Sequence, residues 1–236
     1  MRFNVDGHND GGATRVVEPD TVIVAGYTGR DRAAVQHHIA ELAKIGVPPP
    51  DSFPAYWLLP PWLATADPVI VVAGAQTSGE AELCLVADGD AMFVSLASDH
   101  TDRAAEAIDI ELSKAICPIP VATDAWPLAD VEDHWDQLVL RSWIIEDGAE
   151  VPYQDGGCAS LVPPLDLLAG FPFARPERFL MLTGTVGVIG TIRPSGRFRA
   201  ELHDPVRDRS IELAYDIQTL AAMKVGSPPT TAEQEL

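Results

Sequence analysis

Three acidic residues near the middle of the chain have the type and spacing of a metal-binding set. Glu80 and Glu82 lie two residues apart in an alternating, apolar-flanked stretch, so on a β-strand both would point to the same face. Two ionised carboxylates on one face repel each other unless a cation lies between them. Asp99 follows the next predicted strand, and a hairpin would return it beside the pair. The three carboxylates with waters would suit an octahedral Mg²⁺ or Mn²⁺ ion, and a solvated acidic strand face is the alternative.

A histidine and a glutamate could activate a water molecule. His38 and Glu41 are three residues apart in the helix expected over Asp31–Lys44, which places them on one side of it. The carboxylate could orient the imidazole and stabilise the imidazolium cation that forms when the imidazole, as a general base, takes a proton from water. An exposed helical ion pair is the alternative interpretation.

Two further features could bind a negatively charged oxygen. Lys114 lies among apolar residues and could stabilise a developing oxyanion if its ammonium enters a pocket, although such lysines also extend to solvent. The segment Thr183-Gly184-Thr185 combines hydroxyl groups with a glycine that permits close backbone approach. Glycine-rich turns are also common in β proteins that bind nothing there.

The elements that must position these residues are mostly strands. The chain contains 20 prolines and 18 glycines, so long helices should be few. Short helices are expected over Asp31–Lys44, Ala104–Leu112 and Pro163–Ala169. Strands are expected over Val22–Ala25, Val69–Val72, Glu80–Val86, Ala91–Ala97, Leu138–Ile145, Phe179–Thr183, Val186–Ile192, Phe198–Leu202 and Ser210–Tyr215. This pattern predicts a sheet-rich α+β fold, with residues 1–20 as an N-terminal arm, 21–225 as a single domain and 226–236 as a disordered tail.

Composition excludes several classes of protein. The 236 residues include 16 Lys and Arg against 35 Asp and Glu, a net charge of −19, so neither nucleic acid nor an anionic membrane surface is an expected partner. No apolar run approaches the roughly 20 residues that span a bilayer, and the N-terminus lacks a signal-peptide core. Three widely spaced cysteines form no metal or redox motif, which favours a reducing cytoplasm.

Taken in order, these residues resemble the fumarylacetoacetate hydrolase superfamily, and more narrowly an uncharacterised bacterial branch of it. The resemblance runs from about Gly26 to about Tyr215. The residues that carry it are the acidic set Glu80, Glu82 and Asp99, then Arg103, Lys114, the pair His38–Glu41 and the late turn Gly184-Thr185-Val186-Gly187.

The resemblance implies a mixed β-roll or sandwich with a few short helices and a divalent metal at its mouth. Glu80, Glu82 and Asp99 would bind Mg²⁺, with Mn²⁺ or Ca²⁺ as alternatives. His38, oriented by Glu41, would deprotonate water, and Lys114 would stabilise the oxygen that gains charge. Arg103, Gly184, Thr185 and Gln154 would contact the substrate or, in the case of Arg103, hold Asp99 or a neighbouring carboxylate. Relatives are usually homodimers or higher even homo-oligomers.

The implied function is metal-dependent hydrolysis of a carbon–carbon bond in acylpyruvate-like or other β-dicarbonyl small molecules. A decarboxylase, hydratase or isomerase of a 2-oxo acid on the same site is the alternative, and a non-catalytic carboxylate-binding protein is a third. The chain departs from the family pattern at Glu106, where a glutamine is common. A negative charge there disfavours a substrate carboxylate at the same place. His100 and Asp102 also add titratable groups of unassigned role.

Overall fold

Two large sheets form most of the computed structural model, which describes residues 1–7, 12–44, 49–50 and 52–220 but not the side chains of residues 38, 41, 42 and 44. Within these residues, an eight-stranded sheet has the spatial order β2 (Ala13–Val16), β1 (Arg2–Val5), β12 (Asp124–Pro127), β9 (Ala91–Ser98), β8 (Ala81–Asp88), β15 (Arg178–Thr185), β3 (Thr21–Gly26) and β4 (Ala55–Leu59). A five-stranded sheet has the order β14 (Ala149–Gly157), β13 (Val139–Glu146), β16 (Arg197–Asp204), β17 (Arg209–Thr219) and β6 (Val69–Val72). Two short ladders pair β10 (Thr101–Asp102) with β7 (Thr77–Ser78) and β11 (Ile119–Pro120) with β5 (Ala64–Thr65).

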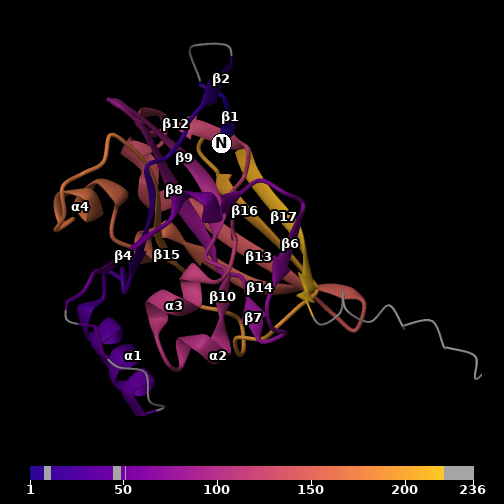
Figure 1. Cartoon of the computed structure of the whole chain (residues 1–236). Coiled ribbons are helices and arrows are strands. Elements are labelled where there is room, and N and C mark those ends of the chain that lie inside the picture. Colours follow the sequence, from indigo (N-terminus) through magenta and orange to yellow (C-terminus); the bar gives the residue numbers. More distant parts are fainter. Residues whose placement is uncertain (8–11, 45–48, 51, 221–236) are drawn as a thin grey trace, which may run out of the picture.

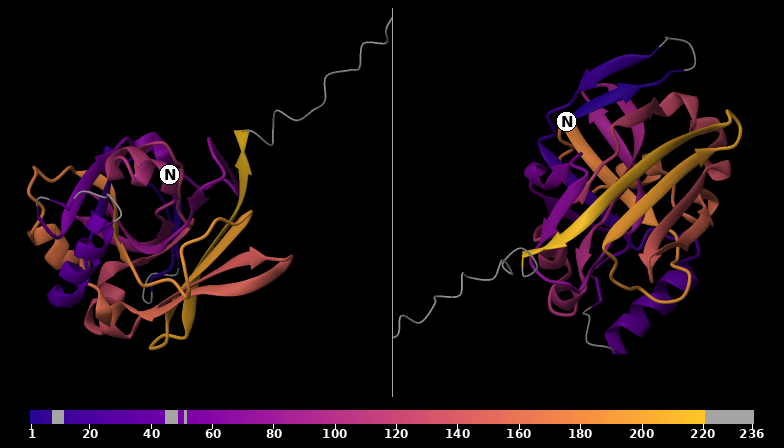
Figure 2. Two further views of the ribbon diagram at one scale, coloured as in Figure 1. Left: turned by 90° about the horizontal axis from the view of Figure 1, so that it is seen from below. Right: turned by 90° about the vertical axis from the view of Figure 1, so that its right-hand side faces the viewer.

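The sheets are mixed, because β1–β12, β3–β15 and β6–β17 pair in parallel whereas most other neighbours are antiparallel. The sheet of β8, β9, β15 and β3 curls, and the sheet of β13, β14, β16 and β17 lies beside it as a separate layer (Figure 2). This arrangement confirms the predicted sheet-rich roll with few short helices.

Both faces of the central strands are buried. On β8, Leu83 and Leu85 belong to the apolar core shared with the five-stranded sheet, whereas Cys84 and Val86 belong to a second core on the opposite face. Such near-continuous burial is expected where a strand is covered on both sides. Glu82 precedes Cys84 by two residues and therefore shares the face of the second core.

Helices α1 (Arg32–Lys44), α2 (Arg103–Glu106) and α3 (Ile110–Ala115) lie at one end of the molecule, near the short strands β7 and β10 (Figure 1). Asp31 caps the N-terminus of α1, because its carboxylate accepts hydrogen bonds from the backbone N–H groups of Ala33 and Ala34 at 2.9 and 3.1 Å. A fourth helix, α4 (Pro164–Ala169), and 3₁₀ turns at 61–63, 128–130, 132–137 and 158–160 complete the described elements.

Three sequence predictions need correction. The single helix expected over Ala104–Leu112 is two helices, because the carboxylate of Asp109 caps a new one by accepting from the N–H of Leu112 at 2.9 Å. The strand expected over Val186–Ile192 is an irregular loop that contains Gly190 with a φ of 84°. The unbroken apolar run of β6 predicts a strand buried on both faces, but β6 is half-exposed, since its outward residues Val69 and Val71 face solvent.

The remaining predicted strands and helices are present with shifts of a few residues. Residues 1–20 contain the hairpin of β1 and β2, which joins the eight-stranded sheet through β12. The predicted tail 226–236 lies outside the described residues. Cys84, Cys117 and Cys158 are buried and free. In the described part of the chain, no helix has the length and apolar character needed to cross a membrane.

Candidate functional site

A cavity of about 850 Å³ at the helical end of the roll brings most of the predicted site residues together. It is lined by Glu80, Glu82, Asp99, Arg103, Lys114, Gly184 and Thr185, along with residues of β3, α1 and the loop after β15. The hairpin of β8 and β9 accounts for the first part of this set, because Ala81 pairs with Ser98 and the N–H of Asp99 donates to the carbonyl of Glu80 at 3.0 Å.

Glu82 is deeply buried, with an exposed fraction of 3%, the same as that of Asp99. Its partner strand β15 contains one extra residue between Leu182 and Thr185, which is a β-bulge. The bulge contains Gly184, whose N–H donates to a carboxylate oxygen of Glu82 at 2.7 Å. Burial raises the pKa of Glu82 well above its usual value, and the negative charges of Asp99 and Glu80 raise it further.

Asp99 and Lys114 form a buried ion pair at the next position of the cavity. Lys114, on α3, donates from Nζ to Oδ2 of Asp99, and the hydroxyl of Thr101 donates to Oδ1 at 3.3 Å. Burial alone would lower the pKa of Lys114, but Asp99 and Glu80 outweigh it and the pKa is raised, so the ammonium stays charged. The ring of Trp57 lies 5.6 Å from Nζ, within the range of a cation–π interaction.

Arg103 is the second cation of the cavity and holds two glutamates. Its Nη2 lies 3.1 Å from Glu80, and its Nη1 donates to Glu106 at 2.9 Å. Its Nε donates to the hydroxyl of Ser78 at 2.7 Å. Burial lowers the pKa of Arg103, but Glu80 and Glu106 reverse this effect and raise it. Of the two roles that the sequence suggested for Arg103, the observed contacts are those of a carboxylate holder, and its carboxylates are Glu80 and Glu106 rather than Asp99.

The other three residues assigned to substrate binding, Gly184, Thr185 and Gln154, are already hydrogen-bonded within the protein. The hydroxyl of Thr185 donates to the carbonyl of Ala81 at 2.7 Å, and the N–H of Gly184 is used by Glu82. Gln154 is only 1% exposed, and its amide nitrogen donates to Thr185 and to the carbonyl of Val186 at 2.7 and 2.8 Å. Gln154 therefore ties β14 to the bulged end of β15, and substrate contacts of these residues stay predictions.

His38 and Glu41 belong to α1, and Ala34 and Val35 of this helix line the cavity. The side chains of His38 and Glu41 lie outside the described part of the structure, so their predicted roles stay predictions.

The donor set suits a hard divalent cation. Three carboxylates face one cavity, and the negative charges of Asp99 and Glu80 add to the effect of burial in raising the pKa of Glu82. As the side chains stand, no three His, Cys, Asp or Glu of the described residues are arranged to hold an ion. The ion pairs explain this arrangement, because Lys114 holds Asp99 and Arg103 holds Glu80. Glu80, Glu82 and Asp99 fit such an ion in donor type and in location.

Next to the site lie His100, whose role the sequence left unassigned, and two aromatic residues, Tyr215 and Trp57. His100 directly follows Asp99 in the chain and is fully buried; its Nδ1 lies 3.0 Å from the hydroxyl of Tyr215, which lies 2.8 Å from the hydroxyl of Ser98. Burial lowers the pKa of His100 to about 4, so this imidazole is neutral and structural. No spacing signal pointed to Tyr215 or Trp57, because strands distant in sequence bring them to the site.

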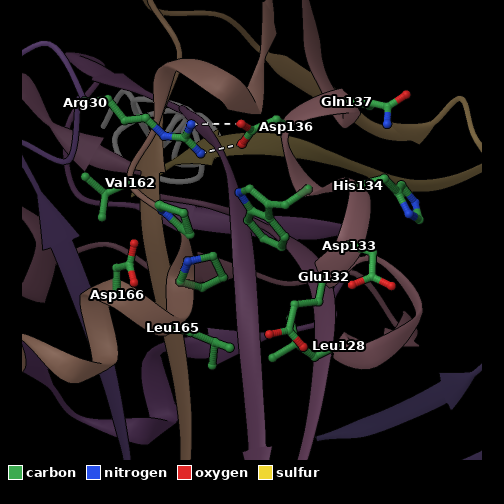
Figure 3. Close-up of a pocket in the computed structure, with 13 residues that line it drawn as sticks. Arg30, Leu128, Glu132, Asp133, His134, Asp136, Gln137, Val162, Leu165 and Asp166 are labelled. Atoms are coloured by element: carbon green, nitrogen blue, oxygen red, sulfur yellow. Dashed lines mark hydrogen bonds and ion pairs between the residues drawn. The ribbon is translucent and has the colours of Figure 1, made fainter.

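A second cavity of about 750 Å³ lies between the 132–137 turn and α4 (Figure 3). It contains none of the predicted site residues. The ion pair of Arg30 with Asp136 crosses it, and Asp133 and Asp166 add further acidic groups. The buried carboxylate set belongs to the first cavity alone, and the chemistry is therefore assigned there.

Comparison with known proteins identifies the family. The family described as "Protein of unknown function (DUF2848)" matches residues 25–215. The chain belongs to this DUF2848 family. The match includes the cavity-lining carboxylates together with Lys114 and Arg103, so the DUF2848 segment contains the whole acidic set. No curated protein matches the chain in sequence.

Solved structures show that this DUF2848 chain has the fumarylacetoacetate hydrolase fold, as its sequence predicted. The yeast protein ynq8, a fumarylacetoacetate hydrolase family protein, is 17% identical with a TM-score of 0.59, over 85% of this chain and 94% of that one. Maleylpyruvate hydrolase from Sphingobium sp. SYK-6, in complex with manganese(II) and pyruvate, is 18% identical with a TM-score of 0.57, over 88% and 74% of the two chains. A 2-keto-3-deoxyarabinonate dehydratase is 14% identical with a TM-score of 0.60, over 89% and 77%.

Proposed function

We propose that the protein is a divalent-metal-dependent hydrolase that cleaves a carbon–carbon bond in acylpyruvate-like or other β-dicarbonyl small molecules. The observation that supports this most is the single cavity that combines a buried, charge-repelled Glu82 with Glu80, Asp99 and the ammonium of Lys114. The likeness of fold to a maleylpyruvate hydrolase with manganese and pyruvate bound supports the same class of chemistry.

Glu80, Glu82 and Asp99 would hold Mg²⁺, with Mn²⁺ or Ca²⁺ as alternatives, since oxygen ligands suit all three ions. When bound, the ion supplies a Lewis acid for the oxygens of a 2-oxo acid. Lys114 keeps its proton in the cavity and donates to the substrate oxygen that gains charge as the carbon–carbon bond breaks. His38, oriented by Glu41, takes the proton from the attacking water. Arg103 keeps Glu80 and Glu106 in place, and Gly184 keeps Glu82 in place.

A panel of 2,4-dioxo acids tests the proposal with Glu82→Gln and His38→Ala in saturating Mg²⁺. We expect both variants to lose at least about 100-fold in kcat, the usual loss for a group that acts on the reacting atoms. Retained activity of Glu82→Gln would reject the metal role. His203→Ala is the matched control, because this histidine is on β16, is not one of the described residues that line the cavity, and hydrogen-bonds to Ser210 on the neighbouring strand.

The runner-up is lyase or isomerase chemistry on the same site, and the shared fold of a 2-keto-3-deoxyarabinonate dehydratase is the observation that favours it. Such reactions need the ion and enolate stabilisation but no activated water. Activity that survives His38→Ala and disappears in Asp99→Asn identifies this alternative. Unchanged recovery of a tightly bound ligand with every oxo acid would identify a carboxylate-binding protein instead.

We also propose that residues 21–225 act as one catalytic domain, in the cytoplasm, within a homodimer or higher even homo-oligomer. Light scattering of the purified chain tests the oligomeric state, and a monomeric mass would reject it.

A further inference from the structure

Each Lys or Arg among the described residues that line the cavity is paired with a carboxylate. Lys114 pairs with Asp99, and Arg103 pairs with Glu80 and Glu106. The remaining cation, Arg193 in the loop after β15, pairs with Glu146 on β13 and lies over the ring of Tyr153 at 5.2 Å. Among the described lining residues, no Lys or Arg is therefore left to receive a second carboxylate of a substrate.

Apolar side chains make up much of the remaining wall. They come from α1, α3, the segment before α4 and the loop after β15, and they are Val35, Ile110, Leu161, Val186, Val188 and Ile192. Val35, Leu161 and Val186 are almost fully buried, so these three side chains are closely packed by the protein. A substrate that reaches past the carboxylate set meets these hydrocarbon surfaces.

Glu106 adds a charge at the same cavity. It accepts two hydrogen bonds from Arg103, and its negative charge raises the pKa of the neighbouring Tyr27 after the effect of burial. A distal carboxylate of a substrate would lose water, find no unpaired Lys or Arg among the described lining residues and lie near Glu106, and each of these effects is unfavourable.

We infer that the cavity selects 2-oxo acids, among them 2,4-dioxo acids, whose distal group is an uncharged alkyl or aryl chain rather than a second carboxylate. This inference rests on the proposed function for the oxo-acid end and concerns the opposite end of the same substrate. Burial of each additional methylene group should tighten binding about three- to fourfold until the wall is filled.

Calorimetry with the full chain in excess Mg²⁺ tests the inference with two ligands of equal length. The ligands are 2-oxoheptanoate and 2-oxoheptanedioate, which differ only in a terminal methyl group or carboxylate and lack the 4-oxo group needed for cleavage. We expect 2-oxoheptanoate to bind at least tenfold more tightly, because of the uncompensated carboxylate in its counterpart. Equal or tighter binding of 2-oxoheptanedioate would overturn the inference.

A matched pair of variants locates the selectivity. Ile192 lines the cavity and is 45% exposed, whereas Ile189 is 49% exposed and is not one of the lining residues. Ile192→Arg should narrow the ratio of the two dissociation constants at least fivefold by supplying a free cation, and Ile189→Arg should leave it unchanged. Equal effects of both variants would contradict the assigned wall.

Turnover separates this inference from the proposed function. If 2-oxoheptanoate binds selectively but no 2,4-dioxo acid is cleaved, the inferred ligand class is supported and the proposed hydrolase activity is rejected. If 2,4-dioxo acids are cleaved but 2-oxoheptanedioate binds better than 2-oxoheptanoate, the proposed hydrolase activity is supported and the inferred ligand class is rejected.

Discussion

Substitution of Gly184 by alanine should destabilise the protein sharply, because the bulge that positions Glu82 has no room for a side chain. Gly184 has a φ of 98°, and a Cβ atom there would lie 1.8 Å from Oγ1 and 3.0 Å from Cβ of the buried Thr28. The left-handed backbone costs an L-residue about 1–2 kcal/mol. Forcing a methyl group into a packed site costs about 1–3 kcal/mol more. Gly184→Ala should therefore lower the free energy of unfolding by about 2–5 kcal/mol.

Urea denaturation of the metal-free protein measures this loss, with Gly187→Ala as the matched control. Gly187 lies in the loop directly after β15, and a Cβ there would meet nothing within 4 Å. Thr28→Ala removes the two side-chain atoms beyond Cβ, so the double variant should recover at least about 1 kcal/mol relative to additivity. The reasoning is refuted if Gly184→Ala loses no more stability than Gly187→Ala, or if the substitutions at residues 184 and 28 are additive.

Three further predictions follow from the contacts at the site. Lys114→Met leaves the buried Asp99 without its cation and should lower the free energy of unfolding, measured in urea at neutral pH, by about 3–5 kcal/mol. An unchanged free energy of unfolding would contradict a stabilising role of the Lys114–Asp99 ion pair. Because the pKa of Glu82 is raised on folding, the folded metal-free protein binds that proton more tightly than the unfolded chain. The stability of the folded protein should therefore fall as the pH rises above 4.5, the ordinary pKa of a glutamate, and through the raised pKa of Glu82. The stability of Glu82→Gln should depend less on pH. Parallel plots of unfolding free energy against pH for the two proteins contradict the burial argument. Gln154→Leu leaves the N–H of Ala81 and the hydroxyl of Ser142 without their acceptor. At about 1–3 kcal/mol per group, the free energy of unfolding should fall by about 2–6 kcal/mol. A thermal midpoint equal to that of the parent protein contradicts the structural role of Gln154.

The carboxylate set could be predicted because local rules determine it. Alternation places Glu82 on one face of β8, and a tight hairpin fixes the register of β8 against β9. The pairing of cations with carboxylates could not be predicted in the same way. The break at Asp109 creates α3 and brings Lys114 rather than Arg103 to Asp99, and this depends on one capping hydrogen bond.

The loop at 186–192 shows where propensity fails. Its valines and isoleucines favour a strand, yet after Val186 only Val188 forms an isolated bridge, with Gln154. The burial of Val186 and the turn at Gly190 turn this segment into the apolar wall of the cavity instead. Tertiary contacts with β14 decide this outcome, and no single segment encodes them.

A crystal structure of the protein with Mn²⁺ and oxalate tests the central claim most directly, since oxalate mimics the enolate of a 2-oxo acid. We predict one anomalous peak in the first cavity, coordinated by oxygens of Glu80, Glu82 and Asp99, with oxalate completing the shell and Lys114 no longer held by Asp99 alone. A peak elsewhere, or carboxylates still paired with Lys114 and Arg103 around an ion-free cavity at saturating Mn²⁺, would contradict the account.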